Sequence, residues 1–298
     1  MSIAQAVFPK APRLALGAIS LRRMFPRCDN PRCANERSLW PSVRRRSAGI
    51  HIEGRWVCGE SCFEEFLGGL LDAMAPSASR WKPAPHRLPI GLVLLSRGMI
   101  RDDQLREALD RQRLAGNHRL GYWLQQIGAA TEDTITSALA TQWACPVFPL
   151  ARDRSFLHCY AMLPAAVIKA ARMLPVYASR DRSSLYIAFV DGIDHGWLRS
   201  AEHILGCRTV PCLVSESAFN RAIEDISCRT RSEEFLFDSV TDIREMSRIA
   251  TSFAMQLRAS SVQLTGSREF AWVRIHSAEI WRDVLFRLPL ALNPRRDL

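Results

Sequence analysis

Four cysteines near the beginning of the chain have the residue type and spacing of metal ligands. They form two pairs, Cys28 with Cys33 and Cys58 with Cys62, and the second pair lies at the start of a segment with helical character. Four thiolates complete the tetrahedral shell of a structural zinc site. A segment this short has little core of its own, which favours a metal over unrelated buried thiols. We therefore predict a four-cysteine zinc module, with His51 as an alternative ligand.

A second set of residues recurs at an offset of thirty between Pro89 and Gln142. The matching pairs are Ile90/Leu120, Gly91/Gly121, Leu94/Leu124, Gly98/Gly128, Asp103/Asp133, Leu105/Ile135, Ala108/Ala138, Leu109/Leu139 and Gln112/Gln142. Each copy predicts a short helix opened by one glycine and stopped by another, then a longer helix. In the longer helix, the apolar residues and the glutamine share one face because they lie at i, i+3, i+4 and i+7.

This doubled pattern resembles the MshEN-type, cyclic di-GMP-binding N-terminal domain of type II secretion and type IV pilus ATPases. That family has two tandem elements of the form Arg-Leu-Gly, Leu, Gly, Ile/Leu, Leu, Leu, Gln. The second element here reads Arg119, Leu120, Gly121, Leu124, Gly128, Ile135, Leu139 and Gln142, and the first reads Pro89, Ile90, Gly91, Leu94, Gly98, Ile100, Leu105, Leu109 and Gln112. The similarity continues to about Cys228.

The resemblance implies a ligand site made of two similar halves. A bis-guanine dinucleotide presents flat bases and phosphates, which suit guanidinium planes, amide side chains and backbone N–H groups. Arg119 would stack on a base or hold phosphate, and Gly91 and Gly121 would let backbone amides approach the ligand. Gln112 and Gln142 would form hydrogen bonds with base edges or with neighbouring backbone. The aliphatic wall would consist of Ile90, Leu94, Leu105, Leu109, Leu120, Leu124, Ile135 and Leu139.

Two departures from the family pattern leave an alternative open. Pro89 stands where the first arginine is expected, and the spacer from Arg113 to His118 is one residue longer than in the family; Arg87 is a candidate substitute for the missing guanidinium. The same residues also fit a plain helical bundle, with leucines in the core and glycines ending helices. The second hypothesis is therefore a ligand-free adaptor that keeps the fold and docks a protein.

No enzyme motif stands beside the repeat. The related ATPases carry a phosphate loop ending in Gly-Lys-Ser/Thr, but none of Lys10, Lys82 and Lys169 follows a glycine. There is also no Gly-x-Ser-x-Gly elbow, His-Glu-x-x-His pair or dinucleotide fingerprint. We predict a non-enzymatic regulatory protein whose partners are cyclic di-GMP and secretion or pilus machinery.

Composition adds few constraints. The 298 residues carry a formal net charge of +10, mostly from arginine. Arg44 to Arg46 beside the zinc module permit a third hypothesis, nucleic-acid binding, which we consider unlikely because no base-reading residues are identifiable. The apolar stretches are short and broken by Arg or Pro, and reduced cysteines fit the cytosol, so we expect a cytoplasmic protein without membrane insertion.

The elements that must position these residues predict an α+β chain. We expect a basic tail over 1–26, the zinc module with a hairpin between Ile50 and Val57 over 27–75, a linker over 76–86, the tandem helices over 87–143, a small α/β subdomain over 144–228 and a C-terminal α+β segment over 229–298. Periodicity places the main helix of the last segment between Val240 and Leu257, and strands are expected at Ser261–Leu264, Phe270–Ile275 and Val284–Leu288. It gives that segment no function beyond packing or dimerisation.

Overall fold

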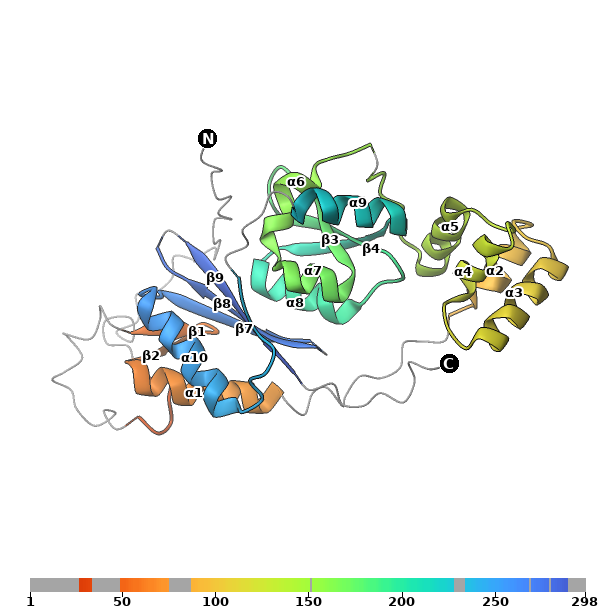
Figure 1. The fold of residues 1–298 in the computed structure, drawn as a ribbon. Helices are drawn as coiled ribbons and strands as arrows, with labels where there is room; N and C mark the ends of the chain where they lie inside the picture. The colour runs from red at the N-terminus through yellow and green to blue at the C-terminus, as the bar shows by residue number, and fades with distance from the viewer. Residues whose placement is uncertain are drawn as a thin grey trace. The chain divides into compact units, whose positions relative to one another are not determined.

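The computed structural model describes residues 27–33, 49–74, 87–150, 152–227, 234–267, 269–278 and 280–288. The basic tail 1–26, the run Arg44–Arg46 and the linker 76–86 lie outside the described residues. The chain divides into two compact units, and the first of them is built from both ends of the sequence (Figure 1). Over the described ranges, the helices are all too short or too polar to cross a bilayer.

The first unit contains a six-stranded mixed sheet of order β2-β1-β7-β8-β9-β6. Strands β7 (Ser261–Gly266), β8 (Phe270–His276) and β9 (Trp281–Arg287) form an antiparallel meander. The hairpin β1 (Ile50–Ile52) and β2 (Arg55–Val57) joins it through parallel pairing of β1 with β7, and β6 (Glu234–Phe237) pairs in parallel with β9. The predicted hairpin and the last three strands are therefore present, whereas β6 was not predicted.

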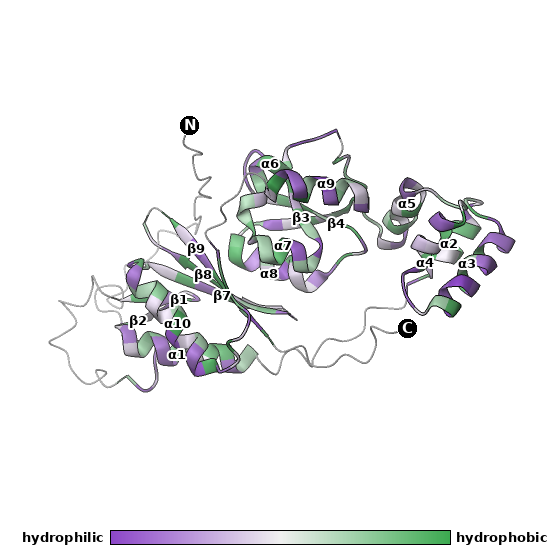
Figure 2. Ribbon diagram, viewed as in Figure 1, coloured by the Kyte–Doolittle hydropathy of each residue, from purple (hydrophilic) through white to green (hydrophobic). Residues whose placement is uncertain are grey.

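Helices α1 (Glu60–Met74) and α10 (Ile243–Gln256) pack against each other and share a core with one face of the sheet. Figure 2 shows hydrophilic and hydrophobic residues alternating around both helices, as expected of amphipathic helices on a sheet. The two helices are close at Gly68, where an added Cβ would make an ordinary van der Waals contact with the Ser247 hydroxyl at 3.6 Å. This differs from the sequence analysis, which placed residues 27–75 and 229–298 in separate domains, because the core is common to both.

A buried ion pair lies in the middle of this sheet. Arg274 on β8 donates from Nε and Nη2 to the two carboxylate oxygens of Asp283 on β9, both at 2.7 Å. The indole N–H of Trp272 donates to the same carboxylate at 2.8 Å. Arg274 and Asp283 are 3% and 6% exposed, so the charge of each is compensated by its partner rather than by water.

The second unit begins with the four helices of the tandem repeat. They are α2 (Ile90–Ser96), α3 (Asp102–Ala115), α4 (Leu120–Gln126) and α5 (Glu132–Trp143). The first residues of the two short helices are offset by thirty, as are those of the two long helices. The short–long arrangement predicted from the repeat is thus confirmed.

An α/β layer completes the second unit. Its sheet has the order β3-β4-β5, with β3 (Met173–Ala178) antiparallel to β4 (Ser184–Phe189) and β4 parallel to β5 (Arg208–Leu213). The crossover between β4 and β5 contains α8 (His195–Leu205). The remaining elements are α6 (Phe156–Cys159), the 3-10 turn η5 (Tyr160–Met162), α7 (Ala165–Ala171) and α9 (Glu216–Ser227). Together the two units make a mixed α+β protein.

Candidate functional site

The two copies of the repeat reproduce each other's backbone bonding. The amide of Leu92 donates to Pro89 O and that of Tyr122 to Arg119 O, both at 3.0 Å. The turns after the short helices match as well, because Gly98 and Gly128 have φ of +66° and +68°. Glycine tolerates this left-handed conformation without the steric cost of a side chain. The copies are therefore equivalent in structure as well as in sequence.

The two copies also pack against each other, with the short helix of one against the long helix of the other. Helix α2 lies mainly against α5 and α4 mainly against α3, so each short helix contacts the long helix of the other copy. Within a copy, glycine sets the helix spacing: a Cβ at Gly91 would lie 2.7 Å from Leu105 Cδ1, and one at Gly121 would lie 3.2 Å from Ile135 Cγ2. These glycines follow the first residue of each short helix rather than opening it, and a side chain at either would force the facing Leu105 or Ile135 side chain to shift.

The glutamine of each copy donates a hydrogen bond to the backbone beside the short helix of the other copy. Gln112 Nε2 donates to His118 O at 3.1 Å, and Gln142 Nε2 donates to Leu88 O at 2.5 Å. Each acceptor lies two residues before the first residue of the other copy's short helix. Of the two roles considered for the glutamine amides, the structure shows the bond to neighbouring backbone. Their bonds hold the two helix starts, at Ile90 and Leu120, in equivalent positions.

The aliphatic residues assigned to the ligand wall fall into two groups. Leu94, Leu124, Leu105 and Ile135 are buried, the first two completely. The half-buried group consists of Ile90, Leu109, Leu120 and Leu139, of which the first three pack against the core of the tandem helices. Only the second group has surface that a ligand can reach without rearrangement.

Arg119 is exposed at the start of α4 and has an acidic partner. Its Nη1 lies 2.9 Å from Asp191 Oδ1, and its side chain is 72% exposed. Asp191 is in the turn after β4 and also pairs with Arg172, which in turn pairs with Glu216 at 2.6 Å. The sequence analysis did not single out Asp191 or Arg172 as neighbours of Arg119; an acidic residue directly after a strand was the available signal.

The first copy differs from the second at its helix start. Pro89 precedes α2 where Arg119 precedes α4. Arg87 does not fill the gap, because its guanidinium carbon lies 3.2 Å from the ring centre of Trp143, and burial lowers the pKa of Arg87. Trp143 also contacts Gly192, where an added Cβ would lie 2.5 Å from the ring.

The longer spacer is absorbed in the turn between α3 and α4. Gly116 ends α3 with φ of +64°, and His118 also has a positive φ, of +60°. The His118 ring stacks on Tyr122, one turn into α4, with ring centres 4.1 Å apart. The additional residue therefore leaves the four-helix arrangement intact.

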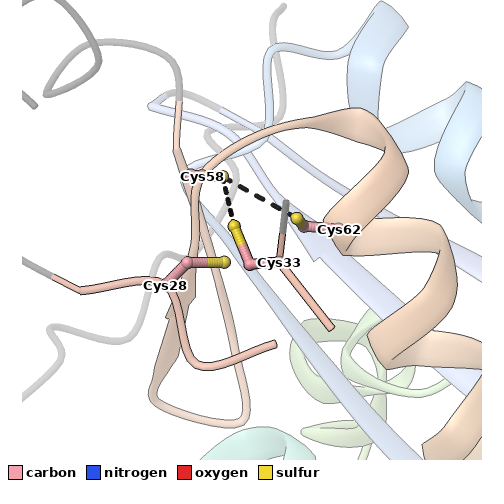
Figure 3. Close-up of side chains that lie close together, drawn as sticks. All are labelled: Cys28, Cys33, Cys58 and Cys62. Carbon is pink, nitrogen blue, oxygen red and sulfur yellow. Dashed lines mark hydrogen bonds between the residues drawn. The ribbon is translucent and has the colours of Figure 1, made fainter. Parts of the chain in front are cut away.

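The four predicted metal ligands come together in the first unit. Cys28 and Cys33 flank a turn in the 27–33 segment, Cys58 follows β2, and Cys62 lies in the first turn of α1 (Figure 3). All four sulfurs lie within 4.8 Å of one another, and Cys58 Sγ is 3.7 Å from both Cys33 Sγ and Cys62 Sγ. A tetrahedral zinc with Zn–S bonds of about 2.3 Å requires sulfurs roughly 3.8 Å apart. The cluster could therefore hold such an ion.

The surroundings of the cysteines match that role. Burial raises the pKa of the Cys58 thiol above its ordinary value and that of Cys62 to about 11. Metal binding would have to displace these protons, as it does at thiolate sites generally. Asn30, in the turn between the first two cysteines, is buried and donates to Glu65 on α1 at 2.9 Å. His51 is exposed on β1 and is not among the clustered groups of the described residues.

Comparison with known proteins places the second unit in context. Residues 143–233, which include the whole α/β layer, match the model of the MshEN domain. The chain contains an MshEN-type domain. The tandem helices precede the matched range, so their assignment depends on the repeat described above.

The chain is also similar to a curated protein and to solved structures. The chain is 27% identical over 134 residues to the type IV pilus assembly ATPase PilB of Thermus thermophilus, a match that covers 45% of this chain and 15% of that protein. Among solved structures, the structure of MshE with cdg is 25% identical, covering 47% of this chain and 99% of that chain at a TM-score of 0.41. The N-terminal domain of XpsE is 17% identical, with 45% and 91% covered and a TM-score of 0.33.

Proposed function

We propose that the tandem helices bind cyclic di-GMP and that the protein acts as a cytoplasmic, non-enzymatic regulator of secretion or pilus machinery. The observation that carries the proposal is that the glutamine of each copy donates to the backbone of the other. These two hydrogen bonds hold the helix starts at Ile90 and Leu120 in equivalent positions. A ligand with two equivalent halves suits a site with two equivalent halves. The MshEN match over the adjoining residues supports this interpretation.

The two halves differ in the strength of binding that they offer. Arg119 pairs with Asp191 but its side chain is largely exposed, so its guanidinium is accessible to phosphate or to a base face. Pro89 in the first half has neither charge nor donor. We therefore propose that the second half-site dominates, with Leu120 and Leu139 as its accessible aliphatic surface.

The expected result is binding that depends on Arg119. Arg119→Ala removes a charge-assisted contact and should weaken the affinity by about 10–100-fold. Gln142→Ala should also weaken it, because the bond that positions the start of α2 is lost. Isothermal titration of the full chain with cyclic di-GMP measures both effects, with far-UV circular dichroism to show that each variant is folded.

Arg113→Ala is the matched control for Arg119. Arg113 is a similarly exposed arginine in the same unit, and its partner is Asp110 on its own helix. Its replacement should leave the affinity unchanged. No heat at millimolar ligand, or an equal loss in the Arg113 variant, would contradict the proposal.

A ligand-free adaptor is the second candidate, and a specific observation favours it. Leu94 and Leu124 are completely buried, and both glutamine amides already bond to backbone. An adaptor would fold normally, would give no heat with cyclic di-GMP, and would still be retained on a pilus or secretion component. The same titration therefore separates the two candidates.

We also propose that Cys28, Cys33, Cys58 and Cys62 bind one structural zinc ion. Four thiolates close the coordination shell and leave no position for substrate. Protein purified with reductant should contain one zinc per chain by mass spectrometry of the metal, and Cys33→Ser should lose it. Cys159→Ser is the control, because Cys159 is a buried thiol of α6 outside the cluster. Substoichiometric metal that is equal in all three proteins would contradict the assignment.

A further inference from the structure

The cysteine cluster lies where the N-terminal part of the chain joins the C-terminal sheet. The 27–33 segment is held to β2 by two bonds involving Asp29, from its amide to Trp56 O at 2.8 Å and from the Trp56 amide to its carboxylate at 2.9 Å. The hairpin β1–β2 has three residues in each strand, too few to be stable alone in water. Its attachment to the sheet is short as well, since the β1–β7 ladder has two residue pairs, at His51 and Ile52, and is extended by a bond from the Glu53 amide to Val262 O.

Helix α1 begins at the same cluster and supplies several side chains of the common core. Cys58 precedes its start and Cys62 lies in its first turn, and its buried side chains Phe63, Leu67 and Leu71 follow at helical spacing. These three residues belong to one core with Ala250 of α10, Val262 of β7 and Val273 of β8, and so do Cys33 and Cys62 themselves. Helix α10 is also hydrogen-bonded to α1, because Ser247 Oγ donates to Glu64 O at 2.5 Å.

We propose that one thiophilic divalent cation, held by Cys28, Cys33, Cys58 and Cys62, is required for the folding of residues 234–288. Metal binding is folding free energy where the ligands are not preorganised in the unfolded chain. Releasing the start of α1 uncovers the face of the sheet that α1 and α10 share, and a single core of this kind melts cooperatively. This inference rests on the metal binding proposed above.

The consequence is a domain that the MshEN-type unit interrupts in sequence. Residues 27–74 and 234–288 form one unit, and most of residues 87–227 form the other. The tandem helices have a core of their own, the strands β3-β4-β5 form a separate sheet, and no cysteine of the cluster belongs to either. Loss of the cation should therefore unfold the first unit and spare the second.

Hydrogen exchange of the full chain, read peptide by peptide, tests this directly. The protein is stripped of metal with a chelator in the presence of reductant, and its exchange is compared with that of the loaded protein. We expect protection in α10 and β7–β9 to fall at least tenfold and to return on adding zinc. Protection in α2–α5 and β3–β5 should change by less than about twofold. A change of that size is within the range expected of distant sites that are not coupled.

A pair of variants repeats the test without chelator. Cys62→Ser should reproduce the exchange of the stripped protein, whereas Cys159→Ser should match the wild type in the first unit. If metal analysis confirms removal and residues 261–287 stay protected, this inference is wrong while the metal site stands. If the purified protein carries no metal at all, the metal site itself is wrong, and the titration with cyclic di-GMP remains an independent question.

Discussion

Asp283→Ala is expected to destabilise the first unit by about 3–5 kcal/mol, because it leaves the Arg274 guanidinium buried without its counter-ion. The substitution also removes the acceptor of the Trp272 indole N–H. Such a loss is a large fraction of the total stability of a domain. Urea unfolding followed by near-UV circular dichroism measures it, and hydrogen exchange in β8 assigns it to the first unit.

Asp238→Ala is the matched control for this change. Asp238 pairs with Arg287 of β9 at 2.6 Å, but both side chains are about half exposed. An exposed pair contributes about 0–1 kcal/mol, so the control should be nearly neutral. The double variant Arg274→Met with Asp283→Leu should recover most of the stability, since apolar residues of similar size often replace a buried pair. Equal destabilisation by the two alanine variants would show that burial does not set the value of the Arg274 pair.

Gly192→Ala is expected to destabilise the second unit by about 2–4 kcal/mol through backbone strain and overpacking. Gly192 has φ of +146°, a conformation that residues with a side chain rarely adopt. An added Cβ would also lie 2.5 Å from Trp143, the last residue of α5, so the ring would have to move. The measurement is the midpoint of thermal unfolding, followed by exchange in α5 and β4.

Gly128→Ala separates the two causes. Gly128 has φ of +68° and nothing within 4 Å of a Cβ, so only the backbone term applies. It should cost about 1–2 kcal/mol. Adding Trp143→Ala to Gly192→Ala should make the glycine substitution less costly than it is in the wild type. If the two glycine substitutions are equally costly, the contact between Gly192 and Trp143 contributes nothing.

The relation to a pilus assembly ATPase concerns a small part of that protein, since the match covers 15% of its length. Regulation of secretion or pilus assembly is therefore a proposal for this chain rather than a property inherited with the matched segment. The departures at Pro89 and in the spacer leave the fold of the tandem helices intact. His118 and Gly116 take positive φ values that absorb the longer spacer, and Pro89 is compatible with the start of a helix.

Several features of this protein were determined by the sequence alone. The thirty-residue offset placed the four helices of the repeat, because apolar periodicity and glycine stops act over a few residues. The type and spacing of Cys28, Cys33, Cys58 and Cys62 indicated one cluster, because two close pairs of cysteines are typical of a structural zinc site. Local pattern also placed the helix near Val240–Leu257 and the strands that follow it.

Other features were decided only by the tertiary structure. Strand β6 has four residues and no clear alternation, and it exists because β9 offers a parallel edge. The pairing of His51 with Ser261 joins the two ends of the chain, and neither strand carries a local signal of its partner. Arg119 faces Asp191, and the glutamines bond across the copies, because the folded chain brings together residues that are distant in sequence. Packing and charge pairing act through space, so no pattern within a few residues could have specified these partners.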